Sequence, residues 1–199
     1  MDLFENDPLA NLLPKDGAAI YHGSIFSADE CENFFQDLLK NIPWRHDEVV
    51  MFGKHIVTAR KVAWVADEGM AYAYSGKSRE PTAWTETLRE LKTICEAHTA
   101  SAYNSCLLNF YQNGTEGMGW HSDDERSIVP QSSIACLSLG AIRKFSFKHK
   151  HTKETVSLLL EDGSLLDMRG AVQENWHHQL PKSKKVCGQR ISLTFRRMR

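Results

Sequence analysis

The chain has 199 residues, of which 42% are hydrophobic and 25% charged, and its formal net charge is −1 at pH 7. A chain of this length fits one domain and can bury well over half of the surface that it exposes when unfolded. Its first residues lack the positive charge and the apolar run of a secretory signal, and no later run is long enough to span a membrane. We therefore expect neither secretion through such a signal nor insertion into a membrane.

Cysteine usage indicates a reducing compartment. The five cysteines are odd in number, lie at least eleven positions apart and form no C-x-x-C pair. A disulfide framework or a zinc ribbon is therefore not expected. We expect a cytoplasmic protein, or a nuclear one if the source is eukaryotic.

Two helices are predicted in the first half of the chain. The first begins at a capping box formed by Ser27 and Glu30 and continues as a buried stripe until Pro43 stops it. The stripe consists of Phe34, Phe35, Leu38, Leu39 and Ile42. The second helix is predicted to begin near Pro81, since proline is tolerated in the first turn, and to run through Cys95.

Strand signals dominate the rest of the sequence. Residues 47–76 are predicted to be extended, with a turn at Gly53 and Lys54. Six further strands are predicted, at residues 106–111, 133–139, 144–147, 156–160, 164–168 and 190–195. Because they are short and separated by turn residues, they are typical of a sandwich, barrel or jelly roll rather than of a parallel sheet.

Basic residues are concentrated in two segments. Residues 143–153 contain five Lys and Arg residues and residues 181–199 contain seven, so together they hold 12 of the 24 in the chain and no acidic residue. Such clustering is typical of a phosphate-binding face. An exposed sheet edge protected by lysine gives the same pattern, so both interpretations stay open.

His121 and Asp123 have the spacing of metal ligands on a strand. Side chains at i and i+2 point to the same face, so an imidazole and a carboxylate converge on one point. Such a pair is two thirds of the facial triad that binds Fe(II) and leaves other coordination positions open. A third ligand is predicted in the segment that contains His177 and His178. These two are neighbours, so on a strand only one of them faces the metal.

Two arginines near the C-terminus predict an anion pocket beside the metal. Arg190 and Arg196 are six positions apart, so on one strand they share a face. Two buried guanidiniums without an anion would be costly. Arginine suits a carboxylate ligand through bidentate pairing, so the pattern favours an acidic cosubstrate.

Four motifs follow one another along the second half of the chain. They are Asn109-Phe110-Tyr111, His121-Ser122-Asp123-Asp124-Glu125, Trp176-His177-His178-Gln179-Leu180-Pro181 and Arg190-Ile191-Ser192-Leu193-Thr194-Phe195-Arg196. In this order they resemble the AlkB family of Fe(II)/2-oxoglutarate-dependent dioxygenases. The resemblance is strongest to the DNA-repair branch that includes the animal nuclear homologues.

The resemblance implies a mainly β fold with flanking helices. Residues 105–199 would form a double-stranded β-helix, or jelly-roll, catalytic core. Residues 18–104 would supply helices and a nucleotide-recognition lid packed on that core, and residues 1–17 an N-terminal extension, all within one structural domain. The implied metal is Fe(II), with 2-oxoglutarate and O2 as cosubstrates. The family pattern aligns His178 with the metal, and His177 is the alternative if the strand register differs.

The resemblance also implies a cosubstrate site. Arg190 and Tyr111 would hold the distal carboxylate of 2-oxoglutarate, and Arg196 and Asn109 the end that chelates iron. Asn109 and Tyr111 are again two positions apart, so they share a strand face. Ser192 stands where the family often has asparagine.

Substrate-binding residues follow from the same resemblance. They are Phe52, Arg60, Tyr72, Tyr74, Ser75, Asp124 and Glu125. Phe52 would be an apolar wedge that fills the gap left by a flipped base, and Tyr74 would stack on that base. A carboxylate at Asp124 would favour a cationic alkylated base. Alternatives are a buried strand residue at Phe52, ordinary sheet aromatics at Tyr72 and Tyr74, and an arginine partner for Asp124.

The implied function is direct-reversal repair of nucleic acid. Hydroxylation of an N-methyl group gives a hydroxymethyl product that releases formaldehyde. We therefore expect oxidative demethylation of 1-methyladenine and 3-methylcytosine in single- or double-stranded DNA by a monomer, with RNA as a further partner. Two alternatives stay open: the same chemistry on RNA, protein or a small molecule, and a non-catalytic, metal-holding jelly roll that binds nucleic acid.

Overall fold

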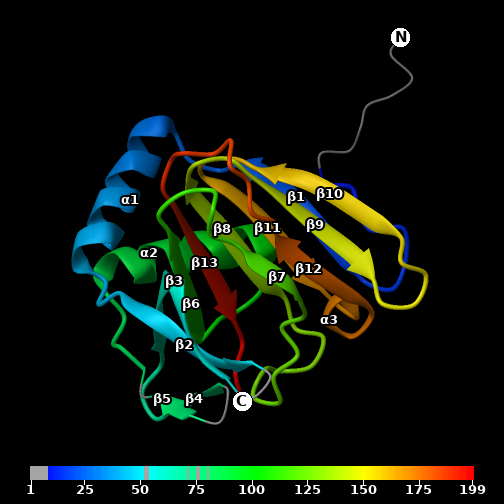
Figure 1. Ribbon diagram of the computed structural model, residues 1–199, viewed down its shortest axis with the longest axis horizontal. Coiled ribbons are helices and arrows are strands. Elements are labelled where there is room, and N and C mark those ends of the chain that lie inside the picture. Colours follow the sequence, from blue (N-terminus) through cyan, green and yellow to red (C-terminus); the bar gives the residue numbers. More distant parts are fainter. Residues whose placement is uncertain (1–8, 52–53, 71, 75–76, 80) are drawn as a thin grey trace.

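Two antiparallel sheets face each other at the centre of the molecule (Figure 1). The computed structural model describes residues 9–51, 54–70, 72–74, 77–79 and 81–199. The larger sheet has seven strands, in the order β1 (Ala18–Ser24), β11 (Ser164–Arg169), β8 (Ile134–Gly140), β13 (Arg190–Arg196), β6 (Ser105–Tyr111), β3 (Lys54–Ala66) and β2 (Arg45–Met51). The smaller sheet has four, in the order β10 (Thr155–Leu160), β9 (Arg143–His149), β12 (Trp176–Leu180) and β7 (Met118–His121). A separate two-stranded ribbon pairs β4 (Tyr72–Tyr74) with β5 (Lys77–Arg79).

This architecture confirms the predicted mainly β fold with a jelly-roll core and flanking helices. The six later strands predicted from the sequence correspond to β6, β8, β9, β10, β11 and β13. The prediction for residues 47–76 is correct only in part, because a turn closed by the hydrogen bond from Met70 N to Asp67 O (3.3 Å) separates β3 from β4. Strands β1, β2 and β3 join the same sheet as the later strands. The predicted segment boundaries at 17/18 and 104/105 stay predictions.

Among the elements that the sequence analysis did not predict, three have sequences with weak signals. Strand β1 contains Gly23 and lacks alternation, and its pairing with β11 stabilises it. Strand β7 has only four residues, one of them Gly119. Helix α3 (Val172–Asn175) is a single turn. All three depend on tertiary neighbours rather than on local pattern.

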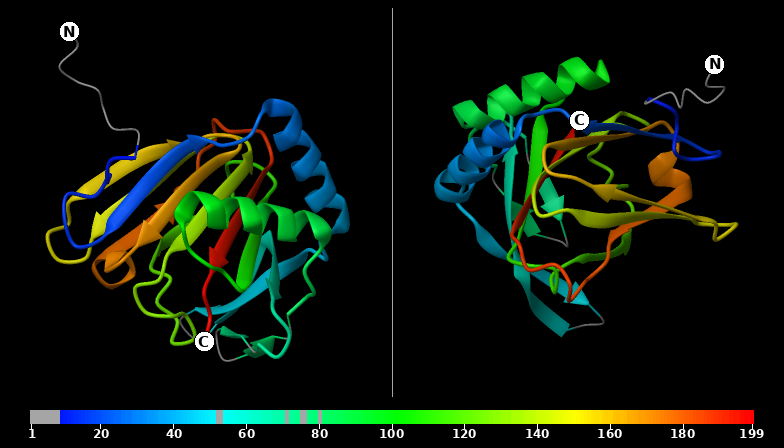
Figure 2. Two further views of the ribbon diagram at one scale, coloured as in Figure 1. Left: turned by 180° about the vertical axis from the view of Figure 1, so that it is seen from behind. Right: turned by 90° about the horizontal axis from the view of Figure 1, so that it is seen from above.

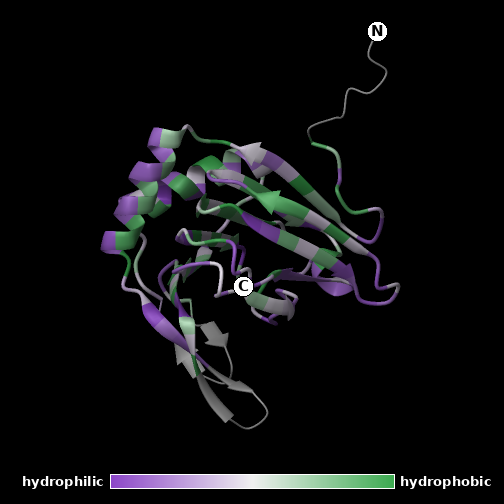
Figure 3. Cartoon of the chain, turned by 45° about the horizontal axis from the view of Figure 1, so that its top comes forward, coloured by the Kyte–Doolittle hydropathy of each residue, from purple (hydrophilic) through white to green (hydrophobic). Residues whose placement is uncertain are grey.

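Both long helices cover the outer face of the larger sheet (Figure 2). Helix α1 (Ala28–Asn41) begins at the predicted capping box, in which the Glu30 carboxylate accepts from Ser27 N at 2.8 Å. Its buried residues include Phe35 and Leu38, and Figure 3 shows the helix banded in hydrophilic and hydrophobic colours. The predicted buried stripe is therefore confirmed.

Helix α2 (Glu86–Thr99) begins later than predicted. Thr85 is its N-cap and accepts from Leu88 N at 3.2 Å. Residues before it stay extended because Thr82 N donates to Trp64 O at 2.9 Å and so attaches this segment to β3. The start predicted near Pro81 was wrong, since this tertiary contact competes with the helix.

Two hydrophobic clusters occupy the two interfaces of this layered structure. One fills the space between the helices and the larger sheet, and the other lies between the two sheets. All five cysteines are free thiols, four of them buried. In the part of the chain that the structure describes, no helix has the length and apolar character needed to cross a membrane.

Candidate metal and cosubstrate site

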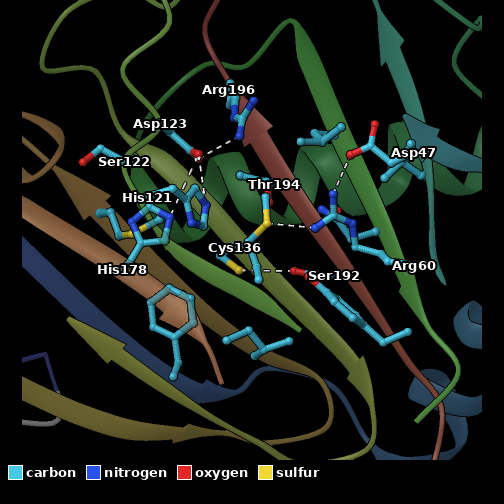
Figure 4. Close-up of a pocket in the computed structure, with 18 of the residues that line it drawn as sticks. Asp47, Arg60, His121, Ser122, Asp123, Cys136, His178, Ser192, Thr194 and Arg196 are labelled. Carbon is cyan, nitrogen blue, oxygen red and sulfur yellow. Dashed lines mark hydrogen bonds and ion pairs between the residues drawn. The ribbon is translucent and has the colours of Figure 1, made fainter. Parts of the chain in front are cut away.

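The smaller sheet brings three potential metal ligands together. His121 ends β7, Asp123 follows in the next loop, and His178 lies on β12 opposite His121 in the antiparallel ladder. Asp123 Oδ1 lies 3.7 Å from His121 Nε2 and 4.0 Å from His178 Nε2. The three ligand atoms all lie within 4.8 Å of one another (Figure 4). Two imidazoles and one carboxylate form the donor set of a facial triad for Fe(II).

The strand register places His178, not its neighbour His177, in this cluster. Trp176, His178 and Leu180 are buried, whereas His177 is half-buried on the other face of β12. There His177 Nδ1 lies 3.2 Å from Ser122 Oγ. Alternation along the strand therefore explains which histidine can reach a metal.

Neighbouring charges keep these side chains in metal-binding protonation states. Burial alone would raise the pKa of Asp123, but the positive charge of Arg196 and the adjacent imidazoles lower it to about 2. Burial and the adjacent His121 lower the pKa of His178 to about 3. At neutral pH Asp123 is thus a carboxylate and His178 a neutral imidazole, the forms that donate electron pairs to a metal.

Hydrogen bonds fix the orientation of the ligands. His121 Nδ1 lies 2.8 Å from Gly119 O, and an N–H donated there leaves the Nε2 lone pair directed at Asp123. The backbone N–H of Asp123 donates to Gln173 Oε1 at 2.9 Å. Arg196 Nη2 donates to Asp123 Oδ2 at 2.7 Å, which leaves Oδ1 for a metal. The cluster is therefore ordered for ligation.

A cavity between the sheets adjoins the cluster (Figure 4). Alternate residues of two strands line it, because side chains two positions apart share a face. They are Arg190, Ser192, Thr194 and Arg196 from β13 and Asn109 and Tyr111 from β6. All the predicted cosubstrate residues therefore line one cavity.

Tyr111 and Arg190 line the inner end of this cavity, and a second buried guanidinium, that of Arg143, lies near the Tyr111 ring. Arg190 donates to Ser138 Oγ at 2.8 Å and lies 5.6 Å from the centroid of the Tyr111 ring. Arg143 lies 5.8 Å from the same centroid and donates to two backbone carbonyls at 2.8 and 2.9 Å. No ion pair joins either guanidinium to a carboxylate among the described residues. Such an end favours an anionic ligand.

Unpaired polar atoms indicate that this end is built for a polar ligand. Arg190 Nε and Asn109 Oδ1 are buried and have no hydrogen-bond partner among the described residues. Since buried polar groups are normally satisfied, these atoms mark positions where a bound molecule would contact the wall. The residues present therefore fit a dicarboxylate such as 2-oxoglutarate.

Arg196 lies in a different environment from Arg190. It pairs with Asp123 at 2.7 Å and its Nη1 lies 3.6 Å from Glu125 Oε1. The charge of Arg196 thus stabilises the carboxylate of Asp123, a potential metal ligand. A contact from Arg196 to the chelating end of 2-oxoglutarate stays a prediction.

At the mouth of the cavity most charges are paired. Arg60, predicted to bind substrate, is buried and pairs with Asp47 at 2.6 Å. Its Nη1 also lies 2.8 Å from Met118 Sδ. Asp124 is exposed and forms no ion pair with any described residue, so the predicted alternative of an arginine partner finds no support.

Several predicted substrate contacts lie outside this description. Phe52 and Ser75 are not among the described residues, and neither are the side chains of Tyr72 and Tyr74. The wedge, the stacking tyrosine and their alternatives stay predictions.

Four residues of the site were missed by the sequence analysis. Thr194 was predictable, because it continues the alternation of Arg190 and Ser192. Asp47 was not predictable, since it lies at a register shift between β2 and β3 and no local sequence pattern indicates that shift. Ser138 and Arg143 act through contacts across strands.

Comparison with known proteins defines the class. The family model of the 2OG-Fe(II) oxygenase superfamily matches residues 17–196, so the chain belongs to this family. It is an Fe(II)- and 2-oxoglutarate-dependent dioxygenase that uses O2. The two-histidine, one-carboxylate donor set fits Fe(II), and the buried guanidinium of Arg190 in the cavity fits a carboxylate of 2-oxoglutarate.

Within the superfamily, the chain is close to the DNA-repair branch of AlkB proteins. It is 35% identical to human "DNA oxidative demethylase ALKBH2" over 87% of this chain and 71% of that protein. Identity to the Arabidopsis thaliana protein of the same name is 35%, over 82% of this chain and 60% of the relative. Human "Alpha-ketoglutarate-dependent dioxygenase alkB homolog 3" is 33% identical over 89% of this chain and 64% of that protein. These relatives confirm the resemblance inferred from the motifs.

A solved structure supports the fold. The structure of OsALKBH1 aligns with a TM-score of 0.61 and 15% identity, and the alignment covers 90% of this chain and 97% of that one. At this identity the likeness concerns the fold alone.

Proposed function

We propose that this protein repairs DNA by oxidative demethylation of N-alkylated bases, with 1-methyladenine and 3-methylcytosine as substrates and formaldehyde as a product. One observation carries the proposal: the same cavity is lined by a two-histidine, one-carboxylate cluster, by buried Arg190 and by Asp124, and neither Arg190 nor Asp124 forms an ion pair with any described residue. The similarity to proteins named DNA oxidative demethylases supports DNA as the substrate.

The metal would be held by His121 Nε2, Asp123 Oδ1 and His178 Nε2. Bound Fe(II), with O2 and 2-oxoglutarate, supplies an oxidant that hydroxylates a C–H bond while 2-oxoglutarate becomes succinate and CO2. The protein has no need of a nucleophile or general base for this reaction. Its own residues, such as Arg196 and Gln173, fix the orientation of the metal ligands.

The cosubstrate would enter with its distal carboxylate toward Arg190 and Tyr111. Ser138 holds the guanidinium of Arg190 in place from the neighbouring strand β8. Asn109 would meet the chelating end near Arg196, and Ser192 the chain between the two carboxylates. Bidentate pairing with a fixed arginine gives both affinity and orientation.

The alkylated base would reach the iron by leaving the base stack. Pairing of Arg60 with Asp47 removes its charge from the mouth, and Asp124 then leaves a net negative charge there. A cationic methylated base is favoured at such a site. One oxygen atom inserted into a C–H bond of the N-methyl group gives N–CH2OH. Its N–C bond then breaks, the hydroxyl proton passes to the nitrogen, and formaldehyde leaves.

Direct assay tests this function. The protein is loaded anaerobically with Fe(II) and then given 2-oxoglutarate, O2 and matched oligonucleotides that carry 1-methyladenine in single-stranded DNA, double-stranded DNA or RNA. Mass spectrometry follows the methyl group, and a formaldehyde assay follows the product. Methyl loss that requires 2-oxoglutarate is the expected result. Turnover of 2-oxoglutarate with the methyl group retained on every oligonucleotide would contradict the proposed substrate.

A further inference from the structure

An exposed tryptophan lies on the outer side of the strand that carries a metal ligand. Trp120 is 37% exposed, and its neighbours Met118 and His121 line the cavity. Strand β7 is the edge of the smaller sheet (Figure 1). A register shift between His178 and Leu180 marks an irregularity in the pairing beside Trp120. Irregularities of this kind at sheet edges redirect side chains and often occur next to active sites.

The ring of Trp120 is in contact with a cation. Lys148 Nζ lies 4.5 Å from the ring centroid. Lys148 comes from β9 and pairs with His177 on β12, so the contact crosses the strand between β9 and β7. The outward positions of β9 and β12 contain no acidic residue. The outer face beside the cavity therefore combines an exposed aromatic ring with positive charge.

We propose that Trp120 is a stacking platform for an unpaired nucleobase next to the base in the cavity, and that Lys148 moves from the ring to the DNA phosphate when this base stacks. The inference rests on the proposed function, because it requires DNA at the cavity. An exposed cation–π contact is weaker than a stack between a base and an aromatic ring, so a base can displace the ammonium. The displaced ammonium then meets the phosphate of the same nucleotide.

Gly119 leaves open space on the strand between the cavity and Trp120. A Cβ built on Gly119 meets no atom within 4 Å, so no described side chain fills this position beside Trp120. A strand of DNA that leaves the cavity would cross the edge strand β7 near this position. Charge complementarity with Lys148 favours a nucleic-acid strand as the occupant.

The platform should serve single strands more than duplexes. A paired neighbour keeps its own stack and partner, whereas an unpaired base is free to turn onto the ring. We therefore expect Trp120 to affect repair of single-stranded DNA more than repair of duplex DNA.

The test removes the ring and the base separately. Trp120→Ala and Trp120→Phe are compared with Leu159→Ala, which changes an exposed apolar residue at the opposite edge of the same sheet (59% exposed). Each protein is assayed on single-stranded DNA with 1-methyladenine between ordinary nucleotides and on the same strand with abasic neighbours. Trp120→Ala should lower kcat/KM about ten-fold on the first substrate and little on the second, with partial rescue by Trp120→Phe. Lys148→Ala should reduce the salt dependence of binding.

An equal loss of kcat/KM on both substrates, or no loss on either, would overturn the proposed stacking role of Trp120. Turnover of 2-oxoglutarate without DNA checks that Trp120→Ala keeps an intact iron site. Fluorescence anisotropy with unmodified and abasic single strands gives a second readout that needs no demethylation. If the wild-type protein binds DNA through Trp120 but removes no methyl group, the proposed function fails and the platform stands.

Discussion

The two ends of the cavity have opposite electrostatics. At the inner end Arg190 and Arg143 lie beside Tyr111, buried to 2% exposure each, without a carboxylate partner among the described residues. At the mouth Arg60 is matched by Asp47, and Asp124 forms no ion pair with any described residue. We therefore propose that the inner end selects an anion and the mouth a cation. Between the two ends, the charge of Arg196 is paired with that of Asp123.

This difference would let one cavity bind two unlike molecules, each at its own end. A dicarboxylate would be stabilised where a buried positive charge has no carboxylate partner among the described residues. A cationic base is repelled from that end and attracted to the mouth. The metal cluster lies where the two meet, because His121 and His178 come from the smaller sheet and the arginines mainly from the larger one.

Loss of the metal cluster should have the largest effect, because both 2-oxoglutarate turnover and demethylation require the bound metal. His178→Ala should abolish both demethylation and 2-oxoglutarate turnover, measured as succinate formation. His177→Ala is the matched control, since that neighbour faces away from the cluster. Full activity in His178→Ala together with loss in His177→Ala would reverse the assignment.

The next largest effect should follow from removing the anion-selecting charge. Arg190→Met should weaken 2-oxoglutarate binding by roughly 30- to 1000-fold, because it leaves a buried carboxylate without its partner. Calorimetry with Mn(II) in place of Fe(II) and without O2 measures this directly. Arg197→Met, at an exposed arginine just after the other end of β13, should leave the affinity unchanged. Similar affinities for both variants would refute the inner end as the carboxylate site.

A smaller effect is expected at Arg143, which shares Tyr111 with Arg190. Arg143→Met should weaken 2-oxoglutarate binding about ten-fold through the lost positive charge. It should also destabilise the fold by about 2 kcal/mol, because backbone carbonyls lose their buried donor. Arg143→Lys keeps the charge but not the planar fork, so it should restore affinity more than stability. A loss of thermal stability with unchanged affinity would make Arg143 a purely structural residue.

Much of the inner end was predictable from alternation along strands. Arg190, Ser192 and Arg196 share one face, as do Asn109 and Tyr111, and the structure places all of them on the cavity wall. The fixed period of a strand makes such inferences strong once the strand is recognised. His178 rather than His177 followed from the family pattern, and the register of β12 and β7 gives the physical reason.

Charge pairing was not predictable in the same way. The basic segments were interpreted as a phosphate-binding face or a lysine-protected edge, yet Arg143, Arg190 and Arg196 are buried at 4% exposure or less. A count of charges along the sequence does not distinguish a buried guanidinium from a solvated one. Asp47 and Arg60 meet through a register shift in the hairpin, which depends on tertiary packing.

The mouth should give the smallest effect, because Asp124 is exposed and solvent screens its charge. Asp124→Asn should lower kcat/KM for 1-methyladenine about five-fold, since an exposed charge pair contributes only about 1 kcal/mol. A neutral lesion such as ethenoadenine should be repaired at nearly the wild-type rate, because the carboxylate offers it no charge attraction. Asp29→Asn, in the first turn of α1, controls for the change in net charge. The same loss on both lesions would mean that Asp124 acts by shape or by holding the adjacent metal ligand, and the mouth would then owe its selectivity to something other than charge.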